Sequence, residues 1–486
     1  MNRRNVLKSL GLGLSAGWMM PSLLTSCKKD DPGPEVPFEG KVAIIGAGAA
    51  GMYAADILKA KGIEVYILEA SGEMGGRIRS LRNQTNYQEI YGQDKPFEFG
   101  VDFPIELGAE LFYGSDSIWG KSVRNYNLPT QELAAVGVDR YVLDNMAKTA
   151  ADFAGDGDFS AVQNFVNTLP DYTGGAQTVQ QAAGLSSRAN KLLNAQAGNR
   201  YSSNSDTIGA QLLAEDLKAS AHDNKWIMMK ANPMQDFLLS RFSAITDLIQ
   251  LNTPVSSINY SGDVISIMDK NGVEHEAQKV IVTVPLSILK TGGISFSPGL
   301  SGVNTSAMNQ FGVASAIRVV IDFKKNFWGD NSGYIWGGTT APQFLNSGVG
   351  RSAFSRTLSF TIYGTAAAAL SGMTRDQQIA AILAELDQIY AGQATQFVRR
   401  DLTSNNIISA VKDWTKEEYI KGGNSYPLAS ATMADRENIS KPIDDKIYFA
   451  GEATDVSGDA GTINGALASA ERVTTEVIES ILGITI

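Results

Sequence analysis

Cysteine and histidine are almost absent from this chain. Among its 486 residues there is one cysteine, Cys27, and there are two histidines, His222 and His275. A disulfide requires two thiols, and a structural zinc site requires several cysteine or histidine ligands close together. Disulfides, thiolate metal sites and histidine-based catalytic triads are therefore poorly supported, and we expect no metal site.

Basic patches are also lacking. Asp and Glu outnumber Lys and Arg by 51 to 41, which gives a formal net charge of -10. The chain has no stripe of Lys and Arg interleaved with aromatic residues of the kind that nucleic-acid binding requires. Nucleic acid is therefore not an expected partner. The 43% hydrophobic content is that of a folded protein, and the length favours about two domains.

The first 27 residues have the pattern of an export signal. Arg3 and Arg4 precede an apolar stretch from Ser9 to Leu24, and charge followed by an apolar run is typical of a segment that directs export. The paired arginines resemble a twin-arginine signal. Residues 24–27, Leu-Thr-Ser-Cys, resemble a lipobox, whose cysteine is lipidated and becomes the mature N-terminus.

These resemblances imply a mature chain held on a membrane by a lipid anchor at Cys27. We expect an exported lipoprotein, located in the periplasm, on an outer membrane or at the cell surface. Residues 28–37 are rich in charge and proline, which disfavours packing, and are predicted to be a tether. A plain membrane anchor or an ordinary signal peptide is the alternative interpretation.

A glycine-rich turn follows the first β-branched run of the folded part. Residues 41–45 predict a strand, and Gly46-x-Gly48-x-x-Gly51 leads into an alanine-rich helix over 49–60. Gly46 permits the turn, Gly48 lets the backbone approach a pyrophosphate, and Gly51 lets helix and strand pack closely. The free N–H groups at the helix N-terminus favour phosphate charge.

A second predicted strand completes this unit. It covers residues 64–68 and ends at Glu69, where a carboxylate can accept hydrogen bonds from an adenosine ribose. Strand, glycine turn, helix, strand and carboxylate together predict a dinucleotide-binding βαβ unit. The pattern serves NAD and FAD equally, so the cofactor must be chosen from the residues that follow.

The segment from Glu69 to Arg77 distinguishes the two cofactors. Its sequence, E-A-S-G-E-M-G-G-R, resembles the E-x-x-x-x-x-G-G-R stretch of the flavin-containing amine oxidase superfamily, which includes monoamine, polyamine and L-amino-acid oxidases. The resemblance implies that FAD is the cofactor, that the glycine pair passes close to its phosphates, and that Arg77 helps to neutralise them.

Further segments resemble this family in the family's order, namely residues 106–110, 251–258, 279–285, 447–454 and 461–466. The resemblance implies that Val255 contacts the adenine, that Glu452 lies near the pyrophosphate, and that backbone N–H groups at Thr462 and Ile463 face the flavin ring. The predicted cofactor-binding residues are Gly46, Gly48, Ala49, Ala50, Gly51, Glu69, Ala70, Gly76, Arg77, Gly108, Ala109, Glu110, Val255, Trp414, Gly451, Glu452, Gly461, Thr462 and Ile463.

The substrate end departs from the family. Where many members have a lysine ten residues before a Phe-Trp pair, this chain has Arg318 before Phe327-Trp328. Arginine keeps the charge but presents a planar fork, so it either binds a water differently or pairs with a substrate carboxylate. An exposed strand arginine is the alternative.

The paired tyrosines that hold the amine in monoamine oxidases are also missing. Matching the motifs places Asn424 or Ser425 at the first position and Thr462 at the second, and Tyr426 fits only in a shifted register. We predict Arg318, Thr462, Asn424 and Tyr426 as the catalytic residues. A simple aryl-alkylamine pocket is not expected.

The placement of these motifs predicts an α/β fold with a discontinuous, Rossmann-like FAD-binding domain and an α+β substrate-binding domain. The FAD-binding domain comprises residues 38–115, 235–300 and 410–486. The substrate-binding domain comprises two segments. Residues 116–234 are predicted to be helical, and residues 301–409 are predicted to form strands with one helix around 375–390.

The predicted function is oxidation of an amine or amino acid to the imine by hydride transfer to flavin N5, with oxygen reoxidising the flavin to give peroxide. Since no cysteine lies in the glycine-rich segments, FAD is expected to be non-covalent. The alternatives are an L-amino-acid oxidase with Arg318 as carboxylate clamp, a desaturase or protoporphyrinogen-oxidase-like enzyme acting on carbon–carbon bonds, and a non-catalytic FAD-binding lipoprotein.

Overall fold

The structure is a computed structural model that describes residues 35–81, 101, 103–223, 225–353 and 355–483. The predicted export signal, the lipobox with Cys27 and the first part of the predicted tether lie outside the described residues. The end of that tether belongs to the folded part, because Val36 is buried and its N–H donates to Lys61 O at 2.9 Å. The fold thus begins before the predicted boundary at residue 38.

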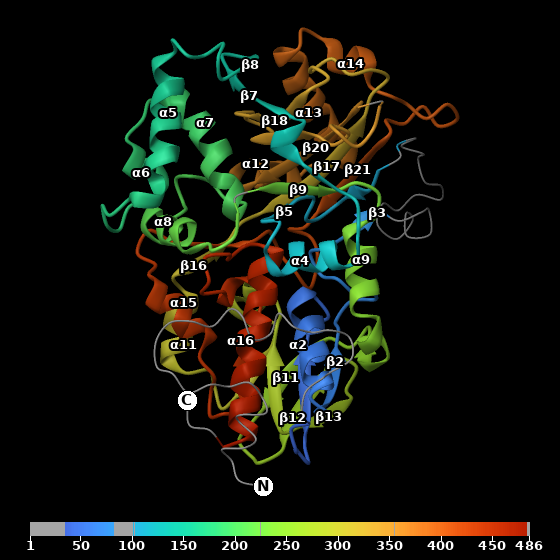
Figure 1. Cartoon of the computed structure of the whole chain (residues 1–486), viewed down its shortest axis with the longest axis vertical. Helices are drawn as coiled ribbons and strands as arrows, with labels where there is room; N and C mark the ends of the chain where they lie inside the picture. The colour runs from blue at the N-terminus through green and yellow to red at the C-terminus, as the bar shows by residue number, and fades with distance from the viewer. Residues whose placement is uncertain (1–34, 82–100, 102, 224, 354, 484–486) are drawn as a thin grey trace.

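Two layered halves are stacked along the long axis of the molecule (Figure 1). The lower half is built on a five-stranded parallel sheet in the order β10-β2-β1-β14-β23. Its strands are β1 (Lys41–Ile45), β2 (Glu64–Leu68), β10 (Ile249–Gln250), β14 (Lys279–Val282) and β23 (Ile447–Phe449). Parallel strands are covered on both faces, and accordingly every residue of β14 and β23 is buried.

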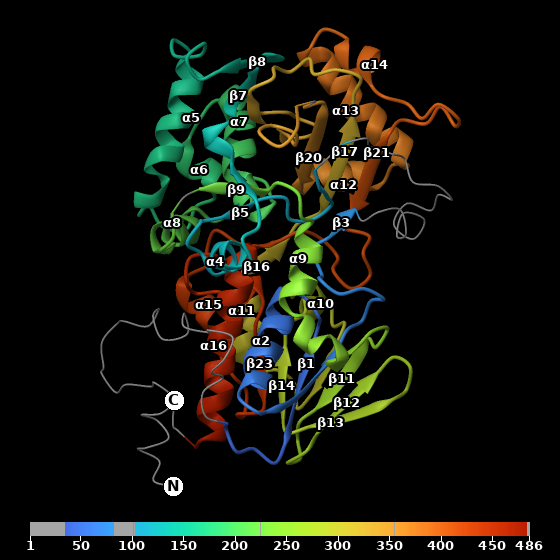
Figure 2. The same ribbon diagram turned by 45° about the vertical axis from the view of Figure 1, so that its right-hand side comes forward.

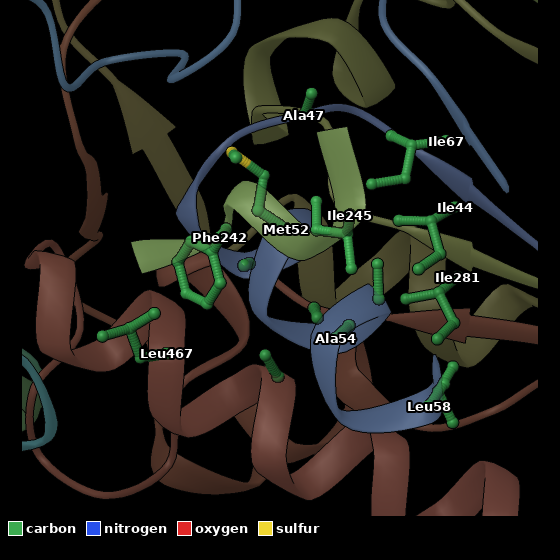
Figure 3. Packing of buried hydrophobic residues seen from close by; sticks show 14 of the residues in the cluster. Ile44, Ala47, Met52, Ala54, Leu58, Ile67, Phe242, Ile245, Ile281 and Leu467 are labelled. Carbon is green, nitrogen blue, oxygen red and sulfur yellow. The ribbon is translucent and has the colours of Figure 1, made fainter. Parts of the chain in front are cut away.

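Two helices cover one face of the parallel sheet. They are α2 (Ala49–Ala60) and α16 (Ile463–Ile481), and α2 has the predicted bounds. In Figure 3, Ile44, Ile67 and Ile281 of the sheet pack with Met52 of α2 and Leu467 of α16. This core holds the glycine-rich turn and the start of α16 at the same end of the sheet.

A second sheet covers the other face, in the order β13-β12-β11-β15. Figure 2 shows three of its strands beside β1 and β14. Ile45 and Val280 pack here against Ile258 and Ile267. The strands are β11 (Val255–Asn259), β12 (Ile265–Asp269), β13 (Glu274–Ala277) and β15 (Ser295–Ser297).

The upper half is built on a seven-stranded sheet in the order β21-β17-β20-β19-β18-β7-β8. Its strands are β7 (Val138–Leu143), β8 (Met146–Thr149), β17 (Ala316–Asp322), β18 (Ser332–Trp336), β19 (Gln343–Asn346), β20 (Thr357–Tyr363) and β21 (Ser409–Asp413). The helices α12, α13 and α14 share one core with this sheet, and α5 and α7 share another. These helices are α5 (Gly157–Thr168), α7 (Ser187–Gly198), α12 (Gly364–Ser371), α13 (Arg375–Ile389) and α14 (Gln393–Phe397).

Shorter elements complete the two halves and the region between them. The strands are β3 (Ser80–Leu81), β4 (Ile105–Glu106), β5 (Phe112–Tyr113), β6 (Thr130–Glu132), β9 (Trp226–Met229), β16 (Phe311–Val313) and β22 (Ser425–Pro427). The helices are α4 (Ile118–Asn125), α6 (Val179–Ala183), α8 (Ala210–Ala219), α9 (Met234–Arg241), α10 (Leu286–Lys290), α11 (Gly302–Met308) and α15 (Met433–Ser440). Short 3-10 helices are η1 (Leu133–Ala135), η2 (Leu169–Asp171), η3 (Asn199–Tyr201), η4 (Ser243–Leu248) and η5 (Glu452–Thr454).

The predicted α/β fold is confirmed, but several segments cross the predicted boundaries. Trp119 and Val123 of α4, placed by sequence in the substrate-binding part, are buried in the core around α2 and α16. Strand β21, placed mostly in the FAD-binding part, pairs with β17 of the upper sheet. The segment 116–234, expected to be helical, also contributes strands β6 to β9. Motif positions locate the cofactor loops but do not show where the chain passes between cores.

Within the described residues, no helix has the length and hydropathy to cross a bilayer. The same residues contain no group of three or more His, Cys, Asp or Glu side chains placed to hold a metal ion.

Candidate active site

A cavity of about 790 Å³ lies where the two halves meet, and both contribute to its lining. The glycine-rich turn, the loop after β2 and the start of α16 line it from the lower half. Strands β5, β17, β18, β19 and β20 and the turn η3 line it from the upper half. The cavity therefore joins the predicted nucleotide end to the predicted substrate end.

Each glycine of the turn meets a different steric requirement. Gly46 has φ of +109°, and a Cβ on Gly51 would lie 2.0 Å from Gly46 O. A Cβ on Gly48, in contrast, would meet nothing within 4 Å, and Gly48 lines the cavity. Gly46 and Gly51 thus allow the turn to form and to pack, whereas Gly48 leaves room for a ligand to approach the backbone.

The carboxylate of Glu69 fixes the loops around this turn. Its Oε2 accepts from Ala47 N at 2.6 Å, and its Oε1 accepts from Ser71 N at 2.9 Å. The side chain is largely buried yet still lines the cavity. Each carboxylate oxygen can accept more than one hydrogen bond, so Glu69 can hold the turn and a ribose hydroxyl together.

Arg77 joins the first and last segments of the lower half. Its Nη1 lies 2.9 Å from Glu452 Oε1 and donates to Gly423 O at 2.8 Å. Glu452 also accepts from Ser425 Oγ at 2.7 Å. The Glu452 side chain is buried while a quarter of Arg77 is exposed in the cavity region. Glu452 thus orients the guanidinium, which remains available to phosphate oxygens.

The N-terminus of α16 is capped by Thr462. Its Oγ1 accepts from Gly465 N at 3.0 Å and donates to Asp459 O at 2.6 Å. Gly461, Thr462 and Ile463 all line the cavity. The positive end of a 19-residue helix therefore lies at the cavity, where it favours negative charge.

Arg318 of β17 forms a buried ion pair with Glu110. Its Nη1 lies 3.0 Å from Glu110 Oε2, and its Nη2 donates to Gly108 O at 2.8 Å. The side chain of Arg318 is only 12% exposed, so the exposed strand arginine of the alternative interpretation is not found. Each terminal nitrogen makes one contact within the protein, Nη1 with Glu110 and Nη2 with Gly108 O. The role of Arg318 as a carboxylate clamp stays a prediction.

Glu110 is held by further groups. Ser347 Oγ donates to Oε1 at 2.8 Å, and Ser359 Oγ donates to Oε2 at 2.5 Å. With Arg318 these hydroxyls compensate a carboxylate that is almost wholly buried. The side chains of Glu110 and Arg318 therefore form a paired part of the cavity wall, and the buried Arg351 lies 3.9 Å from Glu110 Oε1 behind it.

An aromatic wall was missed by sequence reasoning. Phe112, Tyr113 and Tyr334 line the cavity, and Trp226 packs edge-on between the two tyrosines, with centroid distances of 4.7 Å and 5.0 Å. These residues come from β5, β9 and β18, which are far apart in the sequence. No local motif marks them, because only the pairing of β5 with β9 and the packing beside β18 bring them together.

The structure brings together most of the predicted site. Every predicted cofactor-binding residue lines the cavity except Gly51, which lies behind the turn. Among the lining residues, Trp414 is held in place because its Nε1 donates to Leu107 O at 2.9 Å. Of the predicted catalytic residues, Arg318, Asn424 and Thr462 line the cavity. Tyr426 does not: it lies on β22 opposite Gly312 of β16 and packs toward the upper core.

The cavity suits FAD at both ends. The open Cα face of Gly48, the Glu69 carboxylate and the Arg77 guanidinium match the needs of an adenosine diphosphate, while the start of α16 suits a flavin ring that gains negative charge on reduction. The fold and the cavity together define a flavin-dependent oxidoreductase.

Comparison with known proteins supports this assignment. The model of the family "Flavin containing amine oxidoreductase" matches residues 49–478, and this chain belongs to that family. A structure of wild-type putrescine oxidase bound to putrescine superposes with a TM-score of 0.73 at 18% identity, covering 90% of this chain and 99% of the other. Cyclohexylamine oxidase from Brevibacterium oxydans superposes with a TM-score of 0.71 at 17% identity, covering 91% and 99%.

Curated relatives belong to several branches. Lysine-specific histone demethylase 1 homolog 3 of Arabidopsis thaliana is 24% identical over 92% of this chain but only 30% of its own length. Polyamine oxidase 2 of Arabidopsis thaliana is 23% identical, covering 90% of this chain and 89% of its own. L-amino-acid oxidase of Mus musculus is 25% identical, covering 85% and 67%. The chain thus spans from 30% to 53% of the length of the first histone demethylases that it matches.

Proposed function

We propose that this protein oxidises an amine or amino acid to the imine, which water then hydrolyses. When bound, FAD supplies the hydride acceptor at its N5, and oxygen takes up the electrons as peroxide. Putrescine oxidase, polyamine oxidase and L-amino-acid oxidase among the similar proteins support a nitrogenous substrate. The proposal rests mainly on one cavity that combines the dinucleotide cradle with a walled substrate end.

The chain's own residues would position the substrate and exclude water. Phe112, Tyr113 and Tyr334 supply flat apolar surface. The ion pair of Arg318, on strand β17, with Glu110 forms another part of the cavity wall. The motif match puts Asn424 or Ser425, together with Thr462, where monoamine oxidases have tyrosines, and Asn424 and Thr462 line the cavity. Hydride transfer needs orientation and a dry site more than a protein acid or base, so the scarcity of histidine is compatible with this chemistry.

The polar lining favours nitrogenous substrates over the carbon–carbon substrates of a desaturase. Asn199, Gln343 and Asn424 line the cavity together with the charged pair, whereas a desaturase of apolar molecules requires an apolar tunnel.

The experiment is anaerobic mixing of the purified holoenzyme with panels of amines, polyamines and amino acids, followed by aerobic assay of peroxide. Bleaching of the flavin absorbance by at least one nitrogenous substrate, with peroxide on readmission of oxygen, is the expected result. Absence of bleaching with every panel member would reject oxidation of a nitrogenous substrate and leave the desaturase-like enzyme and the non-catalytic FAD-binding protein as the remaining descriptions. Bleaching without peroxide would identify a dehydrogenase with another electron acceptor.

We also propose that the mature protein is exported and held on a membrane by a lipid at Cys27, on the basis of the N-terminal pattern alone. The variant Cys27→Ala should lose incorporation of a labelled fatty acid and leave the membrane fraction. Unchanged labelling would refute the anchor at this residue.

A further inference from the structure

The charges at the substrate end of the cavity do not balance. Among the described residues, the elements of the upper half contribute three charged side chains to the lining, those of Glu110, Arg200 and Arg318. Glu110 and Arg318 neutralise each other at 3.0 Å. Arg200 has no counter-ion among these lining residues; the carboxylates that act on it, those of Asp459 and Asp216, lie outside the lining.

Arg200 is held in place but incompletely satisfied. It lies in the turn η3, and its Nη2 donates to Gly458 O at 2.6 Å. Its buried Nε has no hydrogen-bond partner among the described residues. Its side chain is only 12% exposed, so water can compensate little of the charge.

The nearest carboxylate, that of Asp459, is shared with other groups. It lies 3.9 Å from Arg200 Nη2, beyond hydrogen-bond distance. The same carboxylate accepts from Ser220 Oγ at 3.0 Å and lies 2.7 Å from His222 Nε2. Arg200 therefore has a distant counter-ion that is already engaged, unlike Arg318.

The surroundings of Arg200 place it beside the reacting region. Its guanidinium lies over the ring of Tyr113, with Cζ 5.5 Å from the ring centroid. Its backbone carbonyl lies close to Gly461, immediately before the cap of α16. Arg200 thus stands between the aromatic wall and the helix end that faces the flavin site.

We propose that Arg200 binds an anionic group, most simply a carboxylate, on the amine that this enzyme oxidises. The buried Nε of Arg200 has no hydrogen-bond partner among the described residues, and a guanidinium binds carboxylates strongly. The strands and the turn η3 that line the cavity from the upper half, with the residues just before β5, offer one carboxylate, that of Glu110, and it is paired with Arg318. This inference rests on the proposed function. It predicts a preference for amino acids, or for other amines that carry an acid, over diamines and polyamines.

The test compares the holoenzyme with Arg200→Gln and Arg200→Lys. Substrates are used in matched pairs, L-phenylalanine with phenethylamine and L-lysine with cadaverine, so that each pair differs only in the carboxylate. Binding without turnover is measured separately by titrating benzoate and following the flavin absorbance. Arg241→Gln is the matched control, because Arg241 pairs with Asp56 in the lower half and does not line the cavity.

In the wild type we expect the acid of a pair to be preferred and benzoate to bind. Arg200→Gln should weaken benzoate binding and lower kcat/KM for the acids by about 10-fold to 100-fold, because a charge-assisted hydrogen bond is lost. The amines should change little, and Arg200→Lys should recover part of the loss. Arg241→Gln should behave as wild type.

Other outcomes overturn the inference in distinguishable ways. Equal losses for acids and amines in Arg200→Gln would show that Arg200 acts on the cofactor or the fold. Oxidation of amines alone, with no benzoate binding, would reject the anion site and leave the proposed function intact. If no nitrogenous substrate bleaches the flavin, the proposed function fails, and benzoate titration still decides whether Arg200 binds anions.

Discussion

At the scale of single residues, the pair of Arg318 and Glu110 uses both terminal nitrogens of an arginine, at a position where the resemblance to the family predicts a lysine. A lysine ammonium is one nitrogen, whereas the two terminal nitrogens of Arg318 reach Glu110 and Gly108 O separately. Breaking one partner of a buried ion pair leaves a charge without compensation and costs about 3–5 kcal/mol.

A double-mutant cycle tests this coupling. Arg318→Gln and Glu110→Gln should each lower the free energy of unfolding by about 3 kcal/mol, and the double variant should lose less than the sum, with a coupling energy of at least about 1 kcal/mol. Urea unfolding of the holoenzyme is the measurement. Arg318→Lys, which keeps the charge but not the fork, should lie between wild type and Arg318→Gln. Strict additivity would show that the two side chains act independently.

Glu106, which precedes the cavity segment, makes stability depend on pH. It is buried, accepts from Ser80 Oγ at 2.5 Å and from Met234 N at 2.9 Å, and burial raises its pKa from 4.5 to about 7. The folded state therefore binds more protons than the unfolded state between these values. The contribution of Glu106 to stability is complete below the unfolded pKa and is lost as pH rises through about 7.

The variant Glu106→Gln should remove this dependence, since a glutamine amide has no titrating proton. Like the protonated carboxyl group, it can accept from Met234 N and donate to Ser80 Oγ. Relative to wild type, it should gain roughly 3 kcal/mol in free energy of unfolding between about pH 4.5 and about pH 8. Denaturant unfolding across this range measures the difference. A constant difference between the two proteins would mean that Glu106 does not titrate in the interval.

At the scale of elements, the start of α16 depends on one hydroxyl. Thr462 Oγ1 caps the helix at Gly465 N and ties it to Asp459 O. Thr462→Ala should destabilise the protein by about 1 kcal/mol, whereas Thr462→Ser, which keeps the hydroxyl, should lose much less. Chemical denaturation of the three proteins with FAD bound gives the comparison. Equal loss in both variants would assign the role to the methyl group instead of the cap.

A comparison of local elements with the aromatic wall shows what the sequence can and cannot predict. Strand β1, helix α2 and strand β2 are local, and their glycines have steric roles that follow from the motif, so their bounds and their place at the cavity could be read directly. The wall of Tyr113, Trp226 and Tyr334 depends on strands that are far apart in the chain. The pairing of Arg318 with Glu110, the unpartnered Nε of Arg200 and the position of Tyr426 outside the cavity depend likewise on tertiary partners, which no local pattern encodes.

At the scale of the whole molecule, the FAD site joins segments that are separate in the chain. The cavity lining takes residues from the first βαβ unit, from the loops before β11, from the strands of the upper sheet and from the start of α16. A ligand that binds only this assembled form stabilises it, by about 2.7 kcal/mol when its free concentration is 100-fold above Kd. Removal of FAD should therefore loosen the contact between the halves more than it alters either core.

Removal of the cofactor tests both its attachment and this stabilisation. Because the chain has no cysteine other than Cys27, acid or urea precipitation should release the yellow colour into the supernatant. The apoprotein should unfold at a lower temperature, and added FAD should restore the melting temperature. FMN should restore less, since it lacks the adenosine end that Gly48 and Glu69 would hold. Colour retained in the precipitate would show a covalent flavin, and equal rescue by FMN would show that the glycine-rich turn contributes little to binding.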